Sequence, residues 1–313
     1  MHIVQVYHNK VPVSLYGGME RVIESLCLGH VEMGHKVTLI SYRGDYDLPG
    51  INHIYLDRFE NMAEAEKKYV ELIPGDADVV HLHLPHMAKS CPARNIVTLH
   101  GNLREGESLS TLPPQTVFIS GDHAKRHGRE KFVYHGYDPK SIPLGVDNFS
   151  KRKYFAFLGR AGLKRKGLHI AKELAKKTRT KLLIGGGRGI SLPSRRYLGH
   201  LDNSGKYRLL GGAKALLFPI LWDEPFGLVM IEAMFCGASV FALERGSVPE
   251  VLGLEGGEDL FLKAADKETL LEKMKKHHTG YTPMDIREYA EKHFSYLKMC
   301  EHYLELYDHH AST

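Results

Sequence analysis

Cysteine is scarce in this chain, and no two cysteines lie close together. The four present, Cys27, Cys91, Cys236 and Cys300, form none of the short spacings that bind zinc or carry redox chemistry. The N-terminus enters a strand-like segment at His2–Val6 and lacks the apolar core of a secretory signal. We therefore expect a reduced, cytoplasmic protein.

Long apolar runs and a strong charge of one sign are also missing. No segment approaches the roughly 20 apolar residues that cross a bilayer. The net charge of +5 is mild for 313 residues. It argues against nucleic acid as a partner, and it fits an anionic ligand or peripheral contact with acidic lipid at the inner face of a membrane. Nothing in the sequence indicates an oligomeric state.

What the chain does have is two successive series of strand-like and helix-like segments. Hydrophobic residues make up 43% of the sequence, enough for two domains with separate cores. In the first series, buried strands are predicted at residues 3–6, 36–40, 78–83 and 95–100, and a helix follows Gly17-Gly18. Such alternation predicts right-handed βαβ units and a parallel sheet. We assign residues 1–147 to an N-terminal Rossmann-like domain.

The second series starts after a Pro/Gly/polar hinge at residues 143–153. Strands are predicted at 154–158, 181–184, 215–218 and 239–242, and helices at 267–277 and 284–293. Residues 148–295 form the predicted C-terminal Rossmann-like domain, and a final helix at 296–313 is expected to pack back on the first domain. Because ligands bind outside the carboxyl ends of parallel strands, both domains are expected to face one interdomain cleft.

The stretch from Trp222 to Val251 carries two carboxylates in an apolar setting. Pro225 suits the first turn of a helix, and Leu228–Phe235 is almost wholly apolar. Glu232 is therefore expected about two turns inside a buried helix, where an ionised carboxylate needs hydrogen-bond donors. We expect a ligand to supply them. Glu224 stands at the N-terminal edge of the same helix.

Two interpretations of this pair of glutamates are possible. Paired carboxylates can act as the acid and base of a glycosidase. The placement of Glu224 and Glu232 at the edge and inside of one helix instead favours carboxylates that accept hydrogen bonds from sugar hydroxyls, so we prefer a binding role.

Two further groups have the composition of phosphate-binding loops. Gly17 and Gly18 lie between a strand and a helix, where backbone N–H groups can approach a phosphate. Arg160 and Lys166 follow a strand in the second half and can neutralise a diphosphate. The alternatives are an ordinary turn for the glycines and a solvated basic loop for the cations.

Several polar residues of the first half are candidates for a site. His100, at a predicted strand end, either faces the cleft or is a hydrogen-bonded core residue. His81, His83 and His86 are spaced like metal ligands, but Leu84-Pro85 breaks their geometry. Asp76-Ala-Asp78 resembles a metal-binding D-x-D motif at the wrong end of its strand. We expect no metal and no cofactor.

Taken together, the motifs resemble the retaining glycosyltransferases of the GT-B fold, in the large family numbered four. The resemblance covers nearly the whole chain and rests on GGMERVIESL, DVVHLH, VTLHG, YHGYD, the GR…KG loop and EPFGLVMIEAM…GASV. The form DEPFGLVMIEA followed by RGSVPEV is similar to the branch typified by the avilamycin-pathway transferase. The family resemblance implies an enzyme that moves a hexosyl group from a nucleoside diphosphate sugar, and uridine diphosphate is the common carrier in the family.

The family pattern also implies roles for matching residues. Gly17 and Gly18 would lie against the donor diphosphate, and Arg160 and Lys166 would stabilise it as it leaves. Glu232 would accept hydrogen bonds from the donor ribose.

On the sugar side, the resemblance implies that Glu224 holds hydroxyls and that Phe226, Gly227 and Leu228 present backbone N–H groups. His100 would line the sugar and acceptor side. The acceptor, a sugar, lipid-linked sugar or small molecule, is not indicated. Two alternative functions are a nucleotide-sugar epimerase and a non-catalytic nucleotide-sugar-binding protein.

Overall fold

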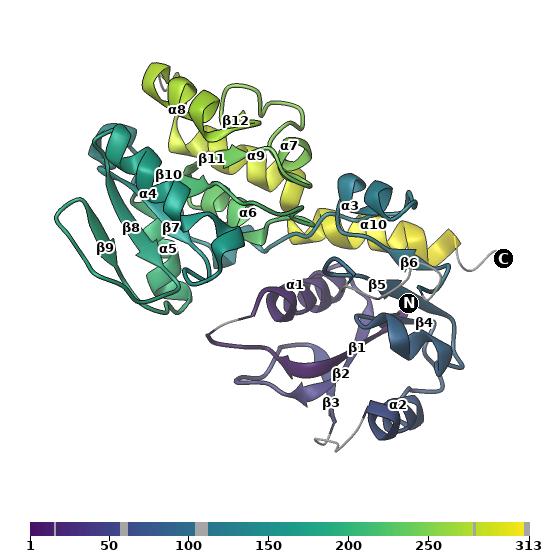
Figure 1. The fold of residues 1–313 in the computed structure, drawn as a ribbon. Coiled ribbons are helices and arrows are strands. Elements are labelled where there is room, and N and C mark those ends of the chain that lie inside the picture. Colours follow the sequence, from purple (N-terminus) through teal and green to yellow (C-terminus); the bar gives the residue numbers. More distant parts are fainter. Residues whose placement is uncertain (16, 57–61, 104–111, 278–279, 310–313) are drawn as a thin grey trace. The chain divides into compact units, whose positions relative to one another are not determined.

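A computed structural model describes residues 1–15, 17–56, 62–103, 112–277 and 280–309 (Figure 1). The chain forms two compact units. Unit 1 comprises Met1–Asp138 together with Ser295–Thr313, and unit 2 comprises Pro139–Phe294. None of the described helices is both long and apolar enough to cross a membrane.

Unit 1 is built on a parallel sheet with strand order β3-β2-β1-β4-β5-β6. Its strands are β1 (His2–Val11), β2 (Lys36–Arg43), β3 (Ile51–Tyr55), β4 (Val79–Leu82), β5 (Asn95–Thr98) and β6 (Thr116–Val117). Its helices are α1 (Gly18–Glu32), α2 (Met62–Glu71), η1 (Pro85–Lys89, a 3-10 helix), α3 (Gly121–Arg126) and α10 (Tyr296–His309).

Side chains of β1 alternate between the two faces of this sheet, as a strand requires. Val4 and Val6 pack in one apolar cluster with Tyr69 of α2. On the opposite face, Gln5 donates a hydrogen bond to the hydroxyl of Tyr307 from α10. The last helix of the chain therefore contributes to the interior of unit 1.

The helix α10 packs against α1 (Figure 1). Tyr296 at its start donates a hydrogen bond to Glu32, and the thiol of Cys300 lies 3.6 Å from the carbonyl oxygen of Leu26. These contacts tie the C-terminal segment to the N-terminal helix.

Unit 2 has a second parallel sheet, with strand order β12-β11-β10-β7-β8-β9. Its strands are β7 (Tyr154–Leu158), β8 (Lys181–Gly185), β9 (Arg195–Tyr197), β10 (Ala213–Phe218), β11 (Ser239–Leu243) and β12 (Leu262–Ala264). Its helices are α4 (Leu168–Lys177), α5 (Asn203–Gly211), α6 (Leu228–Phe235), α7 (Val248–Val251), α8 (Lys267–Lys276) and α9 (Pro283–Phe294), with short 3-10 turns η3 (Pro139–Ser141), η4 (Phe149–Lys151) and η5 (Lys164–Lys166).

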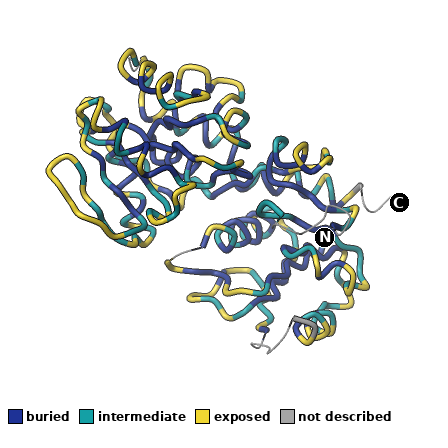
Figure 2. Tube along the Cα trace, in the orientation of Figure 1, coloured by how far each residue is buried: buried dark blue, intermediate teal, exposed yellow. Residues whose placement is uncertain are grey.

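An apolar core joins one face of this sheet to α4 and α8, and α5 and α6 contact β10 from the same unit. Figure 2 shows the central strands buried and the segment around β9 exposed. The two six-stranded parallel sheets confirm the predicted α/β class.

The sequence prediction missed several elements, among them β3, α2, α5, α7 and β12. The sequence of α5, NSGKYRLLG, has a weak helical propensity because asparagine, serine and glycine open it. Its start is fixed by Asp202, whose side chain accepts a hydrogen bond of 2.7 Å from the N–H of Gly205.

Candidate functional site

Glu224 lies in the connection between β10 and α6, on the carboxyl side of the sheet in unit 2. The helix begins at Leu228, after Gly227 with φ of 85°. The prediction that Pro225 occupies the first helical turn is therefore wrong, because the left-handed glycine starts the helix three residues later. Glu232 is consequently about one turn inside α6, and not two.

The carboxylate of Glu224 is largely buried and is held by two donors. Nζ of Lys166 lies 3.0 Å and Nε1 of Trp222 lies 2.9 Å from its Oε2 atom. No hydrogen bond from the described residues reaches the Oε1 atom. Glu224 thus has one oxygen fixed by the protein and one available to a hydroxyl donor.

Trp222 also lies against the basic loop. Nζ of Lys166 is 4.8 Å and Cζ of Arg165 is 4.7 Å from the centroid of its ring. The indole therefore orients both a cation and the carboxylate that faces it. No role for Trp222 was predicted from the sequence, although its position two residues before Glu224 could have indicated one.

A glycine sets the geometry of the loop that carries Lys166. Gly167 has φ of 73°, and a Cβ atom there would lie 1.8 Å from the carbonyl oxygen of Pro219. The N–H of Leu221 donates to the carbonyl of Arg165 over 2.8 Å. The loop is thereby tied to the segment that precedes Glu224, which brings Lys166 to the carboxylate.

Arg160 lies at the start of the same loop, beyond the end of β7, and its side chain is exposed. Its carbonyl accepts a hydrogen bond from the N–H of Leu163 over 3.0 Å. The structure therefore places Arg160 and Lys166 on one loop, after one strand, as the sequence predicted.

Glu232 has a partner within the protein that the sequence analysis missed. Nζ of Lys206 in α5 lies 2.5 Å from Oε1 of Glu232, and both side chains are about nine-tenths buried. The expectation that a ligand must satisfy the buried carboxylate is therefore wrong, because Lys206 already provides a charge-assisted hydrogen bond. Lys206 was not predicted as a partner of Glu232 because its helix, α5, was not predicted.

The segment Phe226–Leu228 offers backbone N–H groups, and not side chains, as hydrogen-bond donors. The ring of Phe226 is 1% exposed and packs edge-on against Phe294, with the centroids 5.8 Å apart. No side chain caps the start of α6. Its first N–H groups lack intrahelical acceptors and carry the positive end of the helix dipole.

In unit 1, Gly17 directly precedes α1, and Gly18 is its first residue. A Cβ atom at Gly17 would lie 2.6 Å from a carboxylate oxygen of Glu20 and 2.7 Å from Val13. Arg21 donates to the carbonyl of Gly17 over 2.9 Å. Local packing thus accounts for a glycine at position 17, and contact of Gly17 and Gly18 with a diphosphate stays a prediction.

His100 belongs to a hydrogen-bonded series of histidines. Its Nε2 lies 2.9 Å from Nδ1 of His83, and its Nδ1 lies 3.3 Å from Nε2 of His135. Nε2 of His83 in turn lies 2.8 Å from Oε1 of Gln5. Both ring nitrogens of His100 are therefore used within unit 1.

The amide of Gln5 determines the proton positions in this series. Its Oε1 can only accept, so Nε2 of His83 donates and Nδ1 of His83 accepts from Nε2 of His100. Nδ1 of His100 then accepts from His135. Burial lowers the pKa of His100 to about 3, which keeps this ring neutral.

The other polar residues weighed from the sequence have structural partners. His81 contacts Thr98 and Tyr307 over 2.7 Å each. Asp76 pairs with Lys36 and His2, and Asp78 accepts from the N–H of His2. Within the described part of the chain, no group of three or more histidine, cysteine or acidic side chains has a metal-binding arrangement.

Comparison with known families divides the chain into two matches. Residues 16–147 match the family model described as Glycosyltransferase Family 4, and residues 145–293 match the model described as Glycosyl transferases group 1. The two matches meet near the start of unit 2 and together cover most of the chain.

The chain is similar to two curated mannosyltransferases. O-antigen chain mannosyltransferase C of Escherichia coli is 23% identical over 362 aligned positions, covering 98% of this chain and 97% of that protein. The phosphatidyl-myo-inositol mannosyltransferase of Mycobacterium tuberculosis is 29% identical over 223 positions, and the alignment covers 58% of each chain.

A solved structure shares the fold. The crystal structure of AviGT4, a glycosyltransferase involved in avilamycin A biosynthesis, superposes with a TM-score of 0.77 at 19% identity. The superposition covers 99% of this chain and 98% of that chain. At this identity, the likeness establishes the architecture.

Proposed function

Since the chain belongs to the glycosyltransferases of the GT-B fold, we propose that it moves a hexosyl group from a nucleoside diphosphate sugar to an acceptor hydroxyl. We further propose that the anomeric configuration is retained and that no metal ion takes part. The observation that carries the proposal is Glu224, whose Oε2 is held by Lys166 and Trp222 while Oε1 is available to the sugar.

The diphosphate is proposed to bind at the loop that contains Arg160 and Lys166. A lysine ammonium has three N–H donors, so Lys166 can keep Glu224 and also contact a phosphate oxygen. Helix α4 begins at Leu168, its N-cap Gly167 directly follows Lys166 and provides no side-chain cap, and the helix adds the positive end of its dipole. Together these groups would stabilise the charge of the leaving diphosphate.

The nucleoside is proposed to bind beside Glu232. Ribose hydroxyls would donate to this carboxylate while Lys206 keeps its Oε1 atom. Uridine is the base suggested by the family resemblance, and the two mannosyltransferase relatives favour mannose as the sugar.

In the proposed reaction, the bond between the anomeric carbon and the phosphate oxygen breaks, and a bond to the acceptor oxygen forms on the same face. The departing diphosphate takes the proton of the acceptor hydroxyl. The described residues then act by positioning and by charge, since Glu224 is occupied by Lys166 and Trp222 and serves as a hydroxyl acceptor.

The acceptor is proposed to be a glycan or lipid-linked sugar, with the enzyme in the cytoplasm and in peripheral contact with the membrane when the acceptor is lipid-linked. This choice of acceptor is suggested by the relatives, which are named for O-antigen chains and for phosphatidyl-myo-inositol.

The test is a panel of nucleoside diphosphate sugars, each assayed for transfer and for slow donor hydrolysis, with the anomeric product assigned by NMR. Glu224→Gln, Lys166→Met and Arg160→Met should each lower the rate by about 10²–10³. Lys164→Met, which removes an exposed lysine from the same loop, is the matched control and should keep the rate.

Four outcomes would contradict parts of the proposal. Full transfer by Lys166→Met, or an equal loss in Lys164→Met, would remove the site assignment. Loss of activity in a chelator would contradict metal independence. Conversion of the donor sugar to its epimer without an acceptor would identify an epimerase.

A further inference from the structure

Unit 2 contains a pocket near the amino ends of its central strands, whereas Glu224 follows the carboxyl end of one of them. Its volume is about 600 Å³, within the range of small-molecule sites. The lining includes Phe155 near the start of β7 and Lys214 near the start of β10. Arg160 and Glu224, by contrast, follow the carboxyl ends of these two strands. The pocket is therefore separate from the candidate site.

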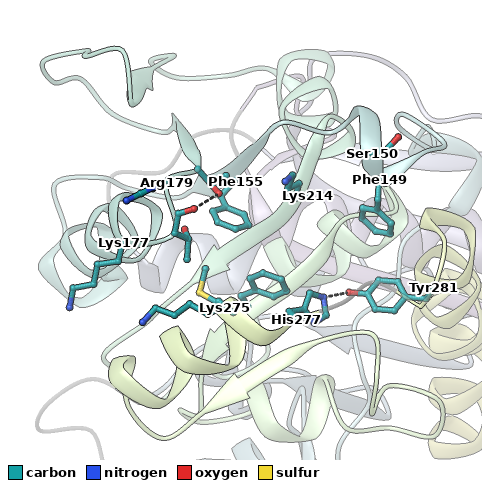
Figure 3. A pocket seen from close by; sticks show the side chains of 13 residues that line it. Phe149, Ser150, Phe155, Lys177, Arg179, Lys214, Lys275, His277 and Tyr281 are labelled. Atoms are coloured by element: carbon teal, nitrogen blue, oxygen red, sulfur yellow. Dashed lines mark hydrogen bonds between the residues drawn. The ribbon is translucent and has the colours of Figure 1, made fainter.

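The walls of this pocket are aromatic and come from separate segments. The rings of Phe155 and Phe241 meet edge to face with centroids 5.8 Å apart, and those of Phe149 and Tyr281 with centroids 5.5 Å apart. The hydroxyl of Tyr281 is 2.9 Å from Nε2 of His277. Figure 3 shows the rings of Phe149, Phe155 and Tyr281 around one space, with the His277–Tyr281 bond at one side. Such walls suit a flat apolar body.

The charge of the lining is of one sign. Among the described residues that line the pocket, four are cations and none is an aspartate or glutamate. Lys177 and Lys275 pair with Glu173 and Glu272 on their own helices, at 2.8 Å and 2.7 Å.

The other two cations are Arg179 and Lys214. Within the described residues, neither side chain has an ion pair. In Figure 3 they lie on opposite sides of the Phe155 ring. A neutral saccharide would be expected to use carboxylate acceptors, so this lining favours an anion.

Arg179 occupies a backbone position that normally takes glycine. It follows Thr178, the C-cap of α4, with φ of 53°, and it is the sole described residue other than glycine with a positive φ. Its N–H donates to the carbonyl of Lys176 over 3.1 Å, and the N–H of Thr180 to that of Ala175 over 3.0 Å. This is the Schellman pattern of a helix end, in which glycine avoids the steric cost of a side chain. Arg179 is exposed and is one of the lining residues, and a strained residue beside a pocket points to a use for its side chain.

We propose that this aromatic and cationic pocket binds a small organic phosphate that carries a planar ring. The ring would lie among Phe149, Phe155 and Tyr281, and the phosphate would bind Arg179 and Lys214. The pocket would act as an accessory site of unit 2, and its ligand binding does not depend on the transfer reaction proposed above.

The proposal can be tested with phenyl phosphate as the probe, by isothermal titration calorimetry. Measurements in an Arg160→Gln/Lys166→Gln background remove phosphate binding at the candidate site. Inorganic phosphate and phenol are the matched halves of the probe. Phenyl phosphate should bind saturably and at least about tenfold more tightly than either half, because it uses both the rings and the cations.

Variants then separate the two parts of the pocket. Arg179→Gly and Lys214→Gln should each weaken phenyl phosphate roughly tenfold or more, as expected for loss of a charge-assisted hydrogen bond. Arg179→Gly should also raise the melting temperature, so its loss of binding would not reflect unfolding. Phe149→Leu should weaken phenyl phosphate and leave inorganic phosphate unchanged.

Lys276→Gln is the control, because it removes an exposed cation of α8 that does not line the pocket. It should leave binding unchanged. The proposal is overturned if phenyl phosphate shows no saturable binding, if inorganic phosphate binds as tightly, or if Lys276→Gln weakens the probe as much as Lys214→Gln.

Discussion

Nζ of Lys166 lies 3.0 Å from Oε2 of Glu224, although the two residues are 58 positions apart in the chain. The cation expected at the leaving diphosphate and the carboxylate expected at the sugar therefore hold each other in position. Trp222 completes the arrangement, since its Nε1 donates to the same oxygen and its ring lies 4.8 Å from the ammonium. A ligand that recruits Lys166 must change the surroundings of this indole.

The first prediction uses Trp222 as a reporter, because it is the one tryptophan of the sequence. Adding uridine diphosphate should shift the tryptophan emission in a saturable manner. Lys166→Met should weaken this response by about tenfold, the effect of losing one charge-assisted contact. Lys164→Met should respond like the wild type. Binding detected by calorimetry without any change in emission would contradict a diphosphate site beside Lys166.

A second prediction concerns the buried pair of Lys206 and Glu232. Lys206→Met leaves a carboxylate buried without its cation and should lower the free energy of unfolding by about 3–5 kcal/mol. The double variant Lys206→Met/Glu232→Leu should recover most of this loss, because an apolar pair needs no charge compensation.

Urea unfolding followed by Trp222 emission measures both variants, since the reporter lies in the same unit. A loss below about 1 kcal/mol in Lys206→Met, the size expected of an exposed pair, would show that the pair is solvated.

A third prediction concerns the backbone behind Glu224. Gly246 has φ of 56°, and a Cβ atom there would lie 2.4 Å from both the amide nitrogen and the carbonyl oxygen of Glu224. Gly246→Ala should displace this carboxylate and lower the transfer rate by about 10², the effect of a misplacement near 1 Å.

Gly162→Ala is the matched control, because a Cβ built at this exposed loop position has no atom within 4 Å apart from those of its chain neighbours. Steady-state kinetics and thermal melts on both variants check the prediction. Equal rates in the two alanine variants would show that the close approach of Gly246 does not position Glu224.

A fourth prediction is that unit 1 loses stability in mild acid. Burial lowers the pKa of His30 and His100 to about 3, and it holds the pKa values of His81, His83 and His135 well below the ordinary 6.5. Below pH 6.5 the unfolded chain takes up protons that folded unit 1 excludes. The free energy of unfolding should therefore fall as the pH drops from about 6.5 toward 3, by about 1.4 kcal/mol per pH unit for each such histidine.

The measurement compares urea unfolding at pH 7 and pH 5. Far-UV circular dichroism follows both units, and Trp222 emission follows unit 2. The unfolding transition of unit 1, which circular dichroism detects and Trp222 emission does not, should move to a lower urea concentration at pH 5. His30→Phe should reduce this pH dependence by about one proton, since no described group hydrogen-bonds the His30 ring. A pH-independent transition in the wild type would contradict neutral buried histidines.

The fold was accessible from the sequence because its strands are short apolar runs separated by regular turns. Ile3–Val6 and Tyr154–Leu158 have no polar periodicity, as expected of strands covered on both faces. Elements without such a clear local pattern were not predicted. α5 opens with asparagine, serine and glycine, so its helical state depends on the cap at Asp202 and on packing against α6.

The sequence by itself determined two parallel α/β sheets, the placement of Arg160 and Lys166 on one loop, and the candidate role of Glu224. These features follow from local periodicity and from motif spacing within short segments. Only the tertiary structure decided that Lys206 balances Glu232, that Trp222 and Lys166 share one oxygen of Glu224, and that His100 is hydrogen-bonded between His83 and His135. Each of these relationships except that of Trp222 joins residues from distant segments. The free energy of burying a polar group depends on which partner the fold brings within hydrogen-bond distance, and local sequence does not specify that partner.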